Sequence, residues 1–241
     1  MRVAAPYDIH GNLPALAAVL AEVPDDAEIV VGGDVFAGPM PADVLARLRE
    51  LGARAHFLHG NADREEAPEE EPGLARYHWV QERLTQDDRS FVDSWPATVT
   101  LDVDGLGRTI FCHGSPRSDL ESITAVTSDE RLRQILADVG EDTVVCGHTH
   151  HQFDRRLDRW RVVNVGSVGL AYEGRPGAYW ALLGPEVEFR RTDYDLSATA
   201  EAIRATTYPD PDEKIEVLTN PPTAQEVAEF FEEQALAAEA S

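Results

Sequence analysis

The sequence predicts an α/β fold in which two mixed β-sheets pack face to face, are flanked by helices and lead into a helical C-terminal extension. In the first half, short apolar runs alternate with segments of helical periodicity, which is typical of parallel sheets. In the second half, strand-like segments follow one another in pairs. The 241 residues, 43% of them hydrophobic, suffice for one large domain or for one domain with a small appendage. We expect a domain at residues 1–195 and a helical, acidic extension at residues 196–241.

Three predicted strands near the N-terminus each run into a polar loop. The expected elements are, in order, a strand at residues 3–7, a helix at 13–20, a strand at 29–31, a helix at 41–51 and a strand at 53–58. Asn12 is expected to cap the first helix, and Pro14 lies in its first turn. Each strand is followed by glycine together with aspartate or asparagine. Ligand sites of parallel sheets gather at the carboxyl ends of strands, so these loops are candidate site segments.

The middle of the chain adds helices and then strand pairs. The expected elements are helices at residues 74–84, 86–95 and 127–139, and strands at 98–103, 108–112, 143–146, 153–157, 161–165, 178–183 and 187–194. Thr85 is a predicted helix cap, and Asp104-Gly105 is a strong hairpin turn signal. Thr127 and Glu130 have the spacing of a capping box for the third helix.

The C-terminal segment differs from the rest. A helix is expected at residues 196–205, and four prolines between residues 209 and 222 predict a loop. Thr223 with Glu226 then predicts the cap of a final acidic helix. This helix has an apolar stripe formed by Val227, Phe230, Phe231 and Leu236. We expect the stripe to pack back onto the domain, with a homo-oligomer contact through this helix or a mobile arm as alternatives.

Composition excludes several classes of partner. The formal net charge is −23, which repels nucleic-acid phosphates, so no extended nucleic-acid face is expected. The acidic excess is concentrated partly in residues 64–71 and partly in the C-terminal segment. No run of 18 apolar residues is present, so no membrane span is expected. Cys112 and Cys146 lie in apolar runs without metal spacing and are expected to be buried, reduced thiols, consistent with a cytoplasmic protein.

A histidine-rich loop follows the predicted strand at residues 143–146. It reads Gly147-His148-Thr149-His150-His151. Two histidines at a spacing of two after a strand end can direct both imidazoles into one cleft, and imidazole is the commonest metal-ligating side chain. The glycine beside them removes side-chain bulk. The loop alone is a weak indication of a metal site, but similar polar clusters follow four strands upstream.

Five polar motifs occur in an order that resembles a known family. They are Asp8-x-His10, Gly33-Asp34, Gly60-Asn61-x-Asp63, His113-Gly114 and Gly147-His148-x-His150. Between residue 3 and about residue 169 the chain is similar to the calcineurin-like metallophosphoesterases, in particular to their small bacterial and archaeal phosphodiesterase branch. The resemblance implies the αββα sandwich of that superfamily and two bound divalent metal ions.

The resemblance also implies which residues hold the metals. Asp34 would be shared between both ions. The first ion would be completed by Asp8, His10 and His150, and the second by Asn61, His113 and His148. Mixed imidazole, carboxylate and amide ligands suit Mn²⁺, Fe or Zn²⁺. The expected activity is hydrolysis of phosphodiesters, or of small phosphomonoesters, by a metal-bridging hydroxide. The alternative is a non-catalytic metal-binding scaffold of the same fold.

One departure from the family pattern affects the expected acid catalyst. Many relatives carry histidine where this chain has Ala62, and that histidine is thought to assist the leaving group. Asp63, its usual partner, is retained. His59 and His151 are the expected substitutes as proton donors. Contacts to a small phosphorylated substrate are expected from Arg117, for which a structural salt bridge is an equal alternative, and from Asn164 and Ser167 in a loop that resembles a family loop near the metals.

Overall fold

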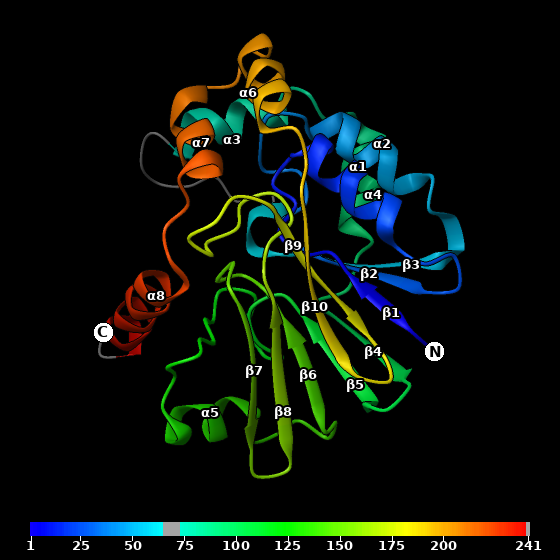
Figure 1. The fold of residues 1–241 in the computed structure, drawn as a ribbon, viewed down its shortest axis with the longest axis vertical. Coiled ribbons are helices and arrows are strands. Elements are labelled where there is room, and N and C mark those ends of the chain that lie inside the picture. Colours follow the sequence, from blue (N-terminus) through cyan, green and yellow to red (C-terminus); the bar gives the residue numbers. More distant parts are fainter. Residues whose placement is uncertain (65–72, 240–241) are drawn as a thin grey trace.

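The computed structural model describes residues 1–64 and 73–239 and arranges them as two packed five-stranded sheets with helices outside (Figure 1). The strand order across the first sheet is β10 (Val187–Thr192), β9 (Ala178–Leu183), β1 (Val3–Ala5), β2 (Glu28–Gly32) and β3 (Ala55–Leu58). The order across the second is β4 (Thr98–Val103), β5 (Gly107–Cys112), β6 (Thr143–Cys146), β8 (Trp160–Val165) and β7 (Gln152–Leu157). The predicted fold class is confirmed.

Both sheets are mixed, and each has a parallel centre. Strands β1, β2 and β3 pair in parallel in the first sheet, as β5, β6 and β8 do in the second. The remaining strands β9, β10, β4 and β7 pair antiparallel to their neighbours. In each sheet, three neighbouring parallel strands therefore have their carboxyl ends at the same edge. Ligand sites of parallel sheets form in the loops at this edge.

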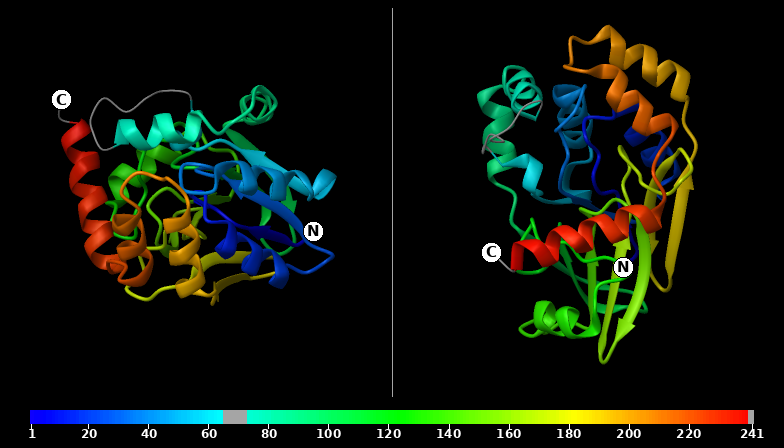
Figure 2. Two further views of the ribbon diagram at one scale, coloured as in Figure 1. Left: turned by 90° about the horizontal axis from the view of Figure 1, so that it is seen from above. Right: turned by 90° about the vertical axis from the view of Figure 1, so that its left-hand side faces the viewer.

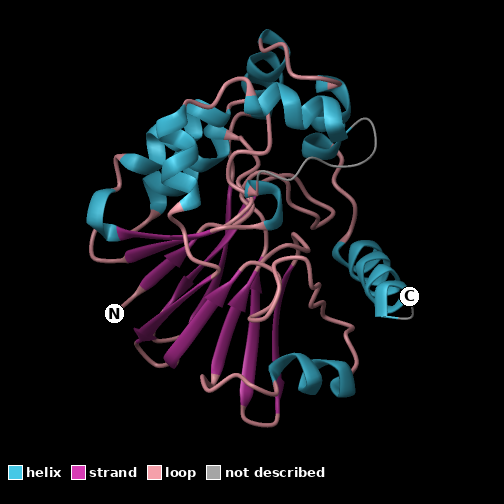
Figure 3. Ribbon diagram, turned by 180° about the vertical axis from the view of Figure 1, so that it is seen from behind, coloured by secondary structure: helices cyan, strands magenta, loops and turns pink. Residues whose placement is uncertain are grey.

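Helices cover the two outer faces of the sheet pair (Figures 2 and 3). The helices are α1 (Leu13–Glu22), α2 (Pro41–Arg49), α3 (Gly73–Gln81), α4 (Gln86–Asp93), α5 (Asp129–Leu136), α6 (Leu196–Ala205), α7 (Pro211–Thr219) and α8 (Ala224–Glu239). Apolar residues of both sheets, such as Val30 and Val145, form the core between them. Leu16 and Leu45 of α1 and α2 pack on the outside of the first sheet, and α5 packs on the second through Leu132.

Helix starts follow the predicted chemistry at three of four positions, including Thr223, which forms the predicted capping box with Glu226 at the start of α8. Asn12 accepts a hydrogen bond from the Ala15 amide at 3.2 Å, and Thr85 forms a capping box at the start of α4. The prediction for the helix at residues 127–139 is wrong in its cap and its end. Ser128 caps α5, which ends at Leu136. The Thr127 hydroxyl instead donates to Glu232 of α8 at 2.7 Å, a long-range partner that local spacing cannot reveal.

The proline-rich segment after residue 208 is not the loop that the sequence predicted. It contains α7, whose first residue is Pro211. Proline is well accommodated at a first helical position because its missing N–H has no partner there in any case. The helix buries Ile215 and Leu218 against Met40 and Ile203, and this apolar contact attaches the extension to the domain.

The final helix packs back onto the domain through only part of the predicted apolar stripe. Figure 2 shows α8 crossing the side of the molecule between α5 and the α6–α7 pair. Its Val227 and Ala228 are buried, whereas Phe230 and Leu236 are about half exposed, at 55% and 54%. A homo-oligomer contact through this helix stays a prediction. Most of the acidic segment at residues 64–71 lies outside the described residues.

Two composition-based expectations can be compared with the structure. Cys112 and Cys146 are both buried and free of disulfide bonds, as predicted. Within residues 1–64 and 73–239, no helix combines the length and the apolar character that a bilayer crossing requires.

Candidate metal centre

The loops at the strand ends bring the seven predicted metal ligands together. Most of these loops need an unusual backbone: five of the predicted ligands have positive φ angles, between 48° and 67°. These residues are Asp8, His10, Asp34, His148 and His150. Only two other non-glycine residues in the described part of the chain have positive φ. Such conformations cost roughly 1–3 kcal/mol each and persist where the surroundings enforce them, often at functional sites.

The first group of ligands surrounds the Asp8 carboxylate. His10 Nε2 and His150 Nε2 lie 3.1 Å apart, and His150 Nε2 lies 3.2 Å from Asp8 Oδ1. Asp8 Oδ1 is buried and has no hydrogen-bond partner among the described residues. One donor atom each from Asp8, His10, Asp34 and His150 lies within 4.8 Å of the others. A buried oxygen without a partner facing imidazole nitrogens fits a cation at this position.

The second group is centred on His113. Its Nε2 lies 3.1 Å from Asn61 Oδ1 and 3.4 Å from Asp34 Oδ1. The rings of His113 and His148 meet edge to face, with centroids 5.2 Å apart. Carboxylate, amide and imidazole donors thus converge here as well.

Asp34 lies between the two groups. Its Oδ2 is 3.8 Å from His10 Nε2, and its Oδ1 is 3.4 Å from His113 Nε2. The Ala62 amide donates to Oδ1 at 2.8 Å and fixes the carboxylate. One carboxylate with an oxygen directed at each group has the arrangement that a ligand shared by two cations requires.

Hydrogen bonds outside the centre orient two of the imidazoles. His113 donates from Nδ1 to the Gly32 carbonyl at 2.9 Å, and His150 donates from Nδ1 to the Leu170 carbonyl at 2.8 Å. Each bond places the proton on Nδ1 and leaves Nε2 directed at the carboxylates, which is how metal-ligating histidines are usually held. The Tyr172 ring also stacks on His150, with centroids 4.7 Å apart.

Burial and neighbouring charges set the protonation of these groups. Burial and the adjacent His150 lower the pKa of His10 to about 3, and burial together with His113 lowers the pKa of His148 to about 4. For His113 burial acts in the same direction, but the carboxylates of Asp34 and Asp8 outweigh it and raise its pKa to about 10. The pKa of Asp34 is far below its usual range, because the nearby imidazoles outweigh its burial. His10, His148 and Asp34 therefore have the neutral-imidazole and carboxylate forms that bind metals, whereas His113 would have to release a proton when a metal binds.

Two glycines allow the loops to approach the carboxylates. A Cβ atom on Gly147 would lie 2.4 Å from Asp8 Oδ2, and one on Gly60 would lie 2.3 Å from Asp34 Oδ1. Real Cβ atoms essentially never come so close to another heavy atom. The His148 amide, next to Gly147, donates to Asp8 Oδ2 at 3.1 Å. The predicted role of this glycine, removal of bulk beside the histidines, agrees with the geometry.

The residues predicted as acid catalysts lie in three different settings. Asp63 accepts hydrogen bonds from the Val35 and Gly60 amides at 2.8 and 3.0 Å, so it holds the loop. Burial and the Asp34 carboxylate raise the pKa of Asp63 to about 7. His151 is buried against Phe153, and burial lowers its pKa, which disfavours a proton-donating imidazolium. His59 lines a cavity of about 260 Å³ that His113 also lines.

The three predicted substrate contacts have partners within the protein. The Arg117 guanidinium forms a bidentate ion pair with Glu121, at 2.8 and 2.6 Å, the structural alternative that the sequence left open. Asn164 donates to the Gly147 carbonyl at 2.7 Å and is fully buried. Ser167 is also fully buried and donates to the Asp8 carbonyl at 2.8 Å. Asn164 and Ser167 therefore position the ligand loops, and their roles as substrate contacts stay predictions.

Two cationic residues near the centre were not predicted from the sequence. Arg76 and Lys214 line a cavity together with His10. They come from α3 and α7, far from the five motifs, so motif spacing could not identify them. For Lys214 the sequence offered one indication, since it is the only lysine of the chain.

Two packed mixed sheets with converging aspartate and histidine loops define the metallophosphoesterase class of folds. The chain belongs to the calcineurin-like phosphoesterase superfamily, whose domain matches residues 1–184. This agrees with the predicted resemblance, and the small bacterial and archaeal branch fits the structural relatives below. Membership of this family indicates a hydrolase that depends on metal.

Solved structures of similar fold include a metallophosphoesterase from Sphaerobacter thermophilus. It is 24% identical, with a TM-score of 0.76 over 90% of this chain and 98% of its own. A hypothetical protein from Pyrococcus horikoshii OT3 is 20% identical, with a TM-score of 0.79 over 92% of this chain and 99% of its own. Both overlaps exceed the length of residues 1–195, so the shared fold includes part of the helical extension. No match was found among the curated proteins.

Proposed function

We propose that this protein is a phosphoesterase that uses two divalent metal ions to hydrolyse phosphodiesters or small phosphomonoesters. The observation that carries the proposal is the position of Asp34, with one oxygen directed at His10 and the other at His113. If Asp34 bound a single cation, imidazole ligands would be expected near one of its oxygens only. The family supports the general reaction, and the geometry supports the number of ions.

Each of the two ligand groups would bind one cation. Asp8, His10 and His150 would hold one ion, Asn61, His113 and His148 the other, and Asp34 both. When bound, such a pair clamps phosphoryl oxygens and lowers the pKa of a water molecule that serves as nucleophile. The mixture of donors suits Mn²⁺, Fe or Zn²⁺.

The chain's own residues would contribute chiefly by positioning. The Ala62 amide and the Gly32 and Leu170 carbonyls fix Asp34, His113 and His150, so the ligands are oriented before substrate arrives. The Ala62 side chain can neither donate nor accept a proton. Protonation of the leaving group must then come from elsewhere or be unnecessary, which favours substrates with good leaving groups.

The alternative function is a metal-binding scaffold without catalytic activity. Ala62 is the observation in its favour, because it removes the family's usual proton donor. Against it stands the cost of burying two carboxylates and several imidazoles in one cluster, which a scaffold does not require.

Elemental analysis and one activity assay separate these functions. The purified full chain, loaded with Mn²⁺ and freed of excess metal, should contain close to two ions per chain and hydrolyse bis(p-nitrophenyl) phosphate. Metal removal by a chelator should abolish turnover, and Mn²⁺ should restore it. Two bound ions with no turnover of aryl diesters or monoesters would favour the scaffold.

A further inference from the structure

Two adjoining cavities extend from the metal centre toward the C-terminal extension. The first has a volume of about 280 Å³ and is lined by residues that include Asn61, Ala62, Tyr77, Arg76 and Tyr208. The second, of about 270 Å³, is lined by residues that include His10, Lys214, Arg76 and Tyr208. Because Arg76 and Tyr208 line both, the two cavities adjoin along this wall. Together they reach a predicted ligand of each metal ion.

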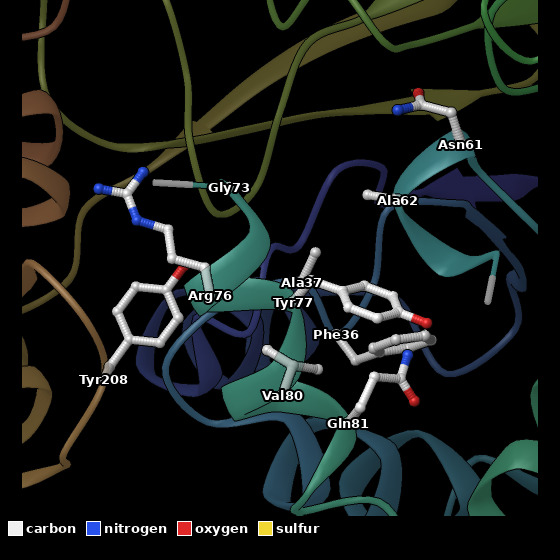
Figure 4. A pocket seen from close by; sticks show the side chains of 10 residues that line it. All are labelled: Phe36, Ala37, Asn61, Ala62, Gly73, Arg76, Tyr77, Val80, Gln81 and Tyr208. Carbon is white, nitrogen blue, oxygen red and sulfur yellow. The ribbon is translucent and has the colours of Figure 1, made fainter. Parts of the chain in front are cut away.

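The first cavity connects the position of the missing histidine with a cationic side chain. In Figure 4 the Ala62 methyl group and Asn61 lie on one side of the cavity, and Arg76 and Tyr208 lie on the other. The small alanine side chain leaves the space beside Asn61 open. A substrate bound at the metals therefore has room to extend toward Arg76.

Lys214 supplies a second positive charge on the wall that continues from there. It makes no hydrogen bond or ion pair with the described residues of the chain. Burial and the neighbouring Arg76 guanidinium together lower its pKa to about 7. Lys214 and His10 line the same cavity, which places the lysine side chain close to the metal centre. A partly buried ammonium beside a second cation is disfavoured: it either loses its proton or is stabilised by a bound anion.

Two carboxylates lie beside Arg76, and one of them, Glu213, also lines the second cavity. The Arg76 guanidinium pairs with Glu213 and lies 3.9 Å from Asp210. Its Nε is nevertheless buried and has no hydrogen-bond partner among residues 1–64 and 73–239. A planar guanidinium with a free N–H and a nearby ammonium match the oxygens of a phosphate group.

We propose that Arg76 and Lys214 form a subsite for a second phosphate group of the substrate, next to the phosphate that is hydrolysed. The preferred substrates are then compounds with two or more phosphate groups. This inference rests on the proposed phosphoesterase function, because it concerns the substrate of that reaction. The subsite itself consists of protein side chains and includes no metal ion. Anion binding at the subsite can therefore be measured without metals.

The binding test uses inorganic phosphate and the full chain in the presence of EDTA. Isothermal titration calorimetry should detect phosphate binding by the wild type, and Lys214→Met should weaken it roughly 10-fold or more, as expected for loss of a charge-assisted hydrogen bond. Arg204→Met is the matched control, because Arg204 is an exposed residue of α6 that pairs with Asp212. Equal phosphate affinity in wild type and Lys214→Met would overturn the proposal.

A second measurement needs no variant. Lys214 is the only lysine, so an amine-reactive reagent has two targets, its side chain and the N-terminal amine. Phosphate should slow modification of Lys214 several-fold and leave the exposed N-terminal amine unaffected, as followed by peptide mass spectrometry. Unprotected Lys214 would contradict the subsite. Failure of the wild type to hydrolyse aryl phosphoesters with Mn²⁺ would instead refute the proposed function, so the two failures are distinguishable.

Discussion

At the scale of single residues, the candidate metal centre depends on backbone positions as much as on ligand chemistry. Gly147 is the clearest case, because a Cβ atom there would lie 2.4 Å from Asp8 Oδ2. The neighbouring His148 and His150 are held in the left-handed region that most residues avoid. The loop therefore fixes both the direction of its imidazoles and its distance from the first carboxylate.

Gly147→Ala should consequently reduce metal binding. The added methyl group must push the loop away from Asp8, and overpacking of this kind typically costs about 1–3 kcal/mol of stability. We expect elemental analysis to show loss of at least one ion per chain. Gly140→Ala is the control, since a Cβ there has no atom within 4 Å. Full metal content in Gly147→Ala would show that the close approach is not needed.

Ala62 determines how the leaving group departs. Without a proton donor at this position, the rate should fall steeply as the pKa of the leaving group rises across a series of aryl phosphodiesters. Ala62→His would place an imidazole in the cavity beside Asn61 and should flatten that dependence, with most benefit for the poorest leaving groups. General acids typically contribute about 10²–10⁴-fold, which sets the upper range.

The measurement is kcat/KM against leaving-group pKa for both proteins. A shallow dependence in the wild type would mean that another donor acts. His59→Ala and His151→Ala would then be the informative variants, with a steeper slope expected from the one that removes the donor.

At the scale of elements, α8 is attached to the domain by a polar cluster. Glu232 accepts hydrogen bonds from Thr124 and Thr127 at 3.1 and 2.7 Å and lies 3.5 Å from Arg131. Phe231, the preceding residue, lies against His148 with ring centroids 5.6 Å apart. The helix therefore contacts both α5 and a predicted metal ligand.

Glu232→Gln should lower the free energy of unfolding by about 1–3 kcal/mol, because it removes the negative charge that accepts the two threonine hydrogen bonds and lies 3.5 Å from the buried Arg131. Urea denaturation measures this change. Glu233→Gln, at the next and exposed position, should change stability by no more than about 0.5 kcal/mol. Equal midpoints for the two variants would indicate that the cluster around Glu232 contributes little.

At the scale of the whole molecule, the sequence predicted what local patterns determine. The strand-end motifs identified the fold, and their seven polar residues indeed lie together in the structure. The proline-rich segment was wrongly predicted to be a loop. In sequence, a proline at the first position of a helix looks the same as a proline in a loop, and only the packing of Ile215 shows that Pro211 begins a helix. Thr127 was wrongly predicted to cap a helix, and Lys214 was not predicted as a site residue. In both cases the neighbouring side chains come from distant parts of the chain.

The assembly of two sheets matters because it places Asp34 between ligands from both of them. His10 comes from a loop of the first sheet and His113 from the end of β5 in the second. Since an amide is a poor bridge between two cations, Asp34→Asn should disturb both sites at once. Asp158→Asn is a matched control, because Asp158 also has a positive φ, 53° against 50° for Asp34, and lies on the surface.

The most direct test is therefore the number of Mn²⁺ ions per chain in Asp34→Asn and Asp158→Asn, measured together with turnover of bis(p-nitrophenyl) phosphate. We expect Asp158→Asn to retain about two ions and wild-type turnover. Asp34→Asn should lose at least one ion and reduce turnover by roughly 10²-fold or more, the range seen when a principal electrostatic contribution is removed. Two ions and normal turnover in Asp34→Asn would contradict the dinuclear centre.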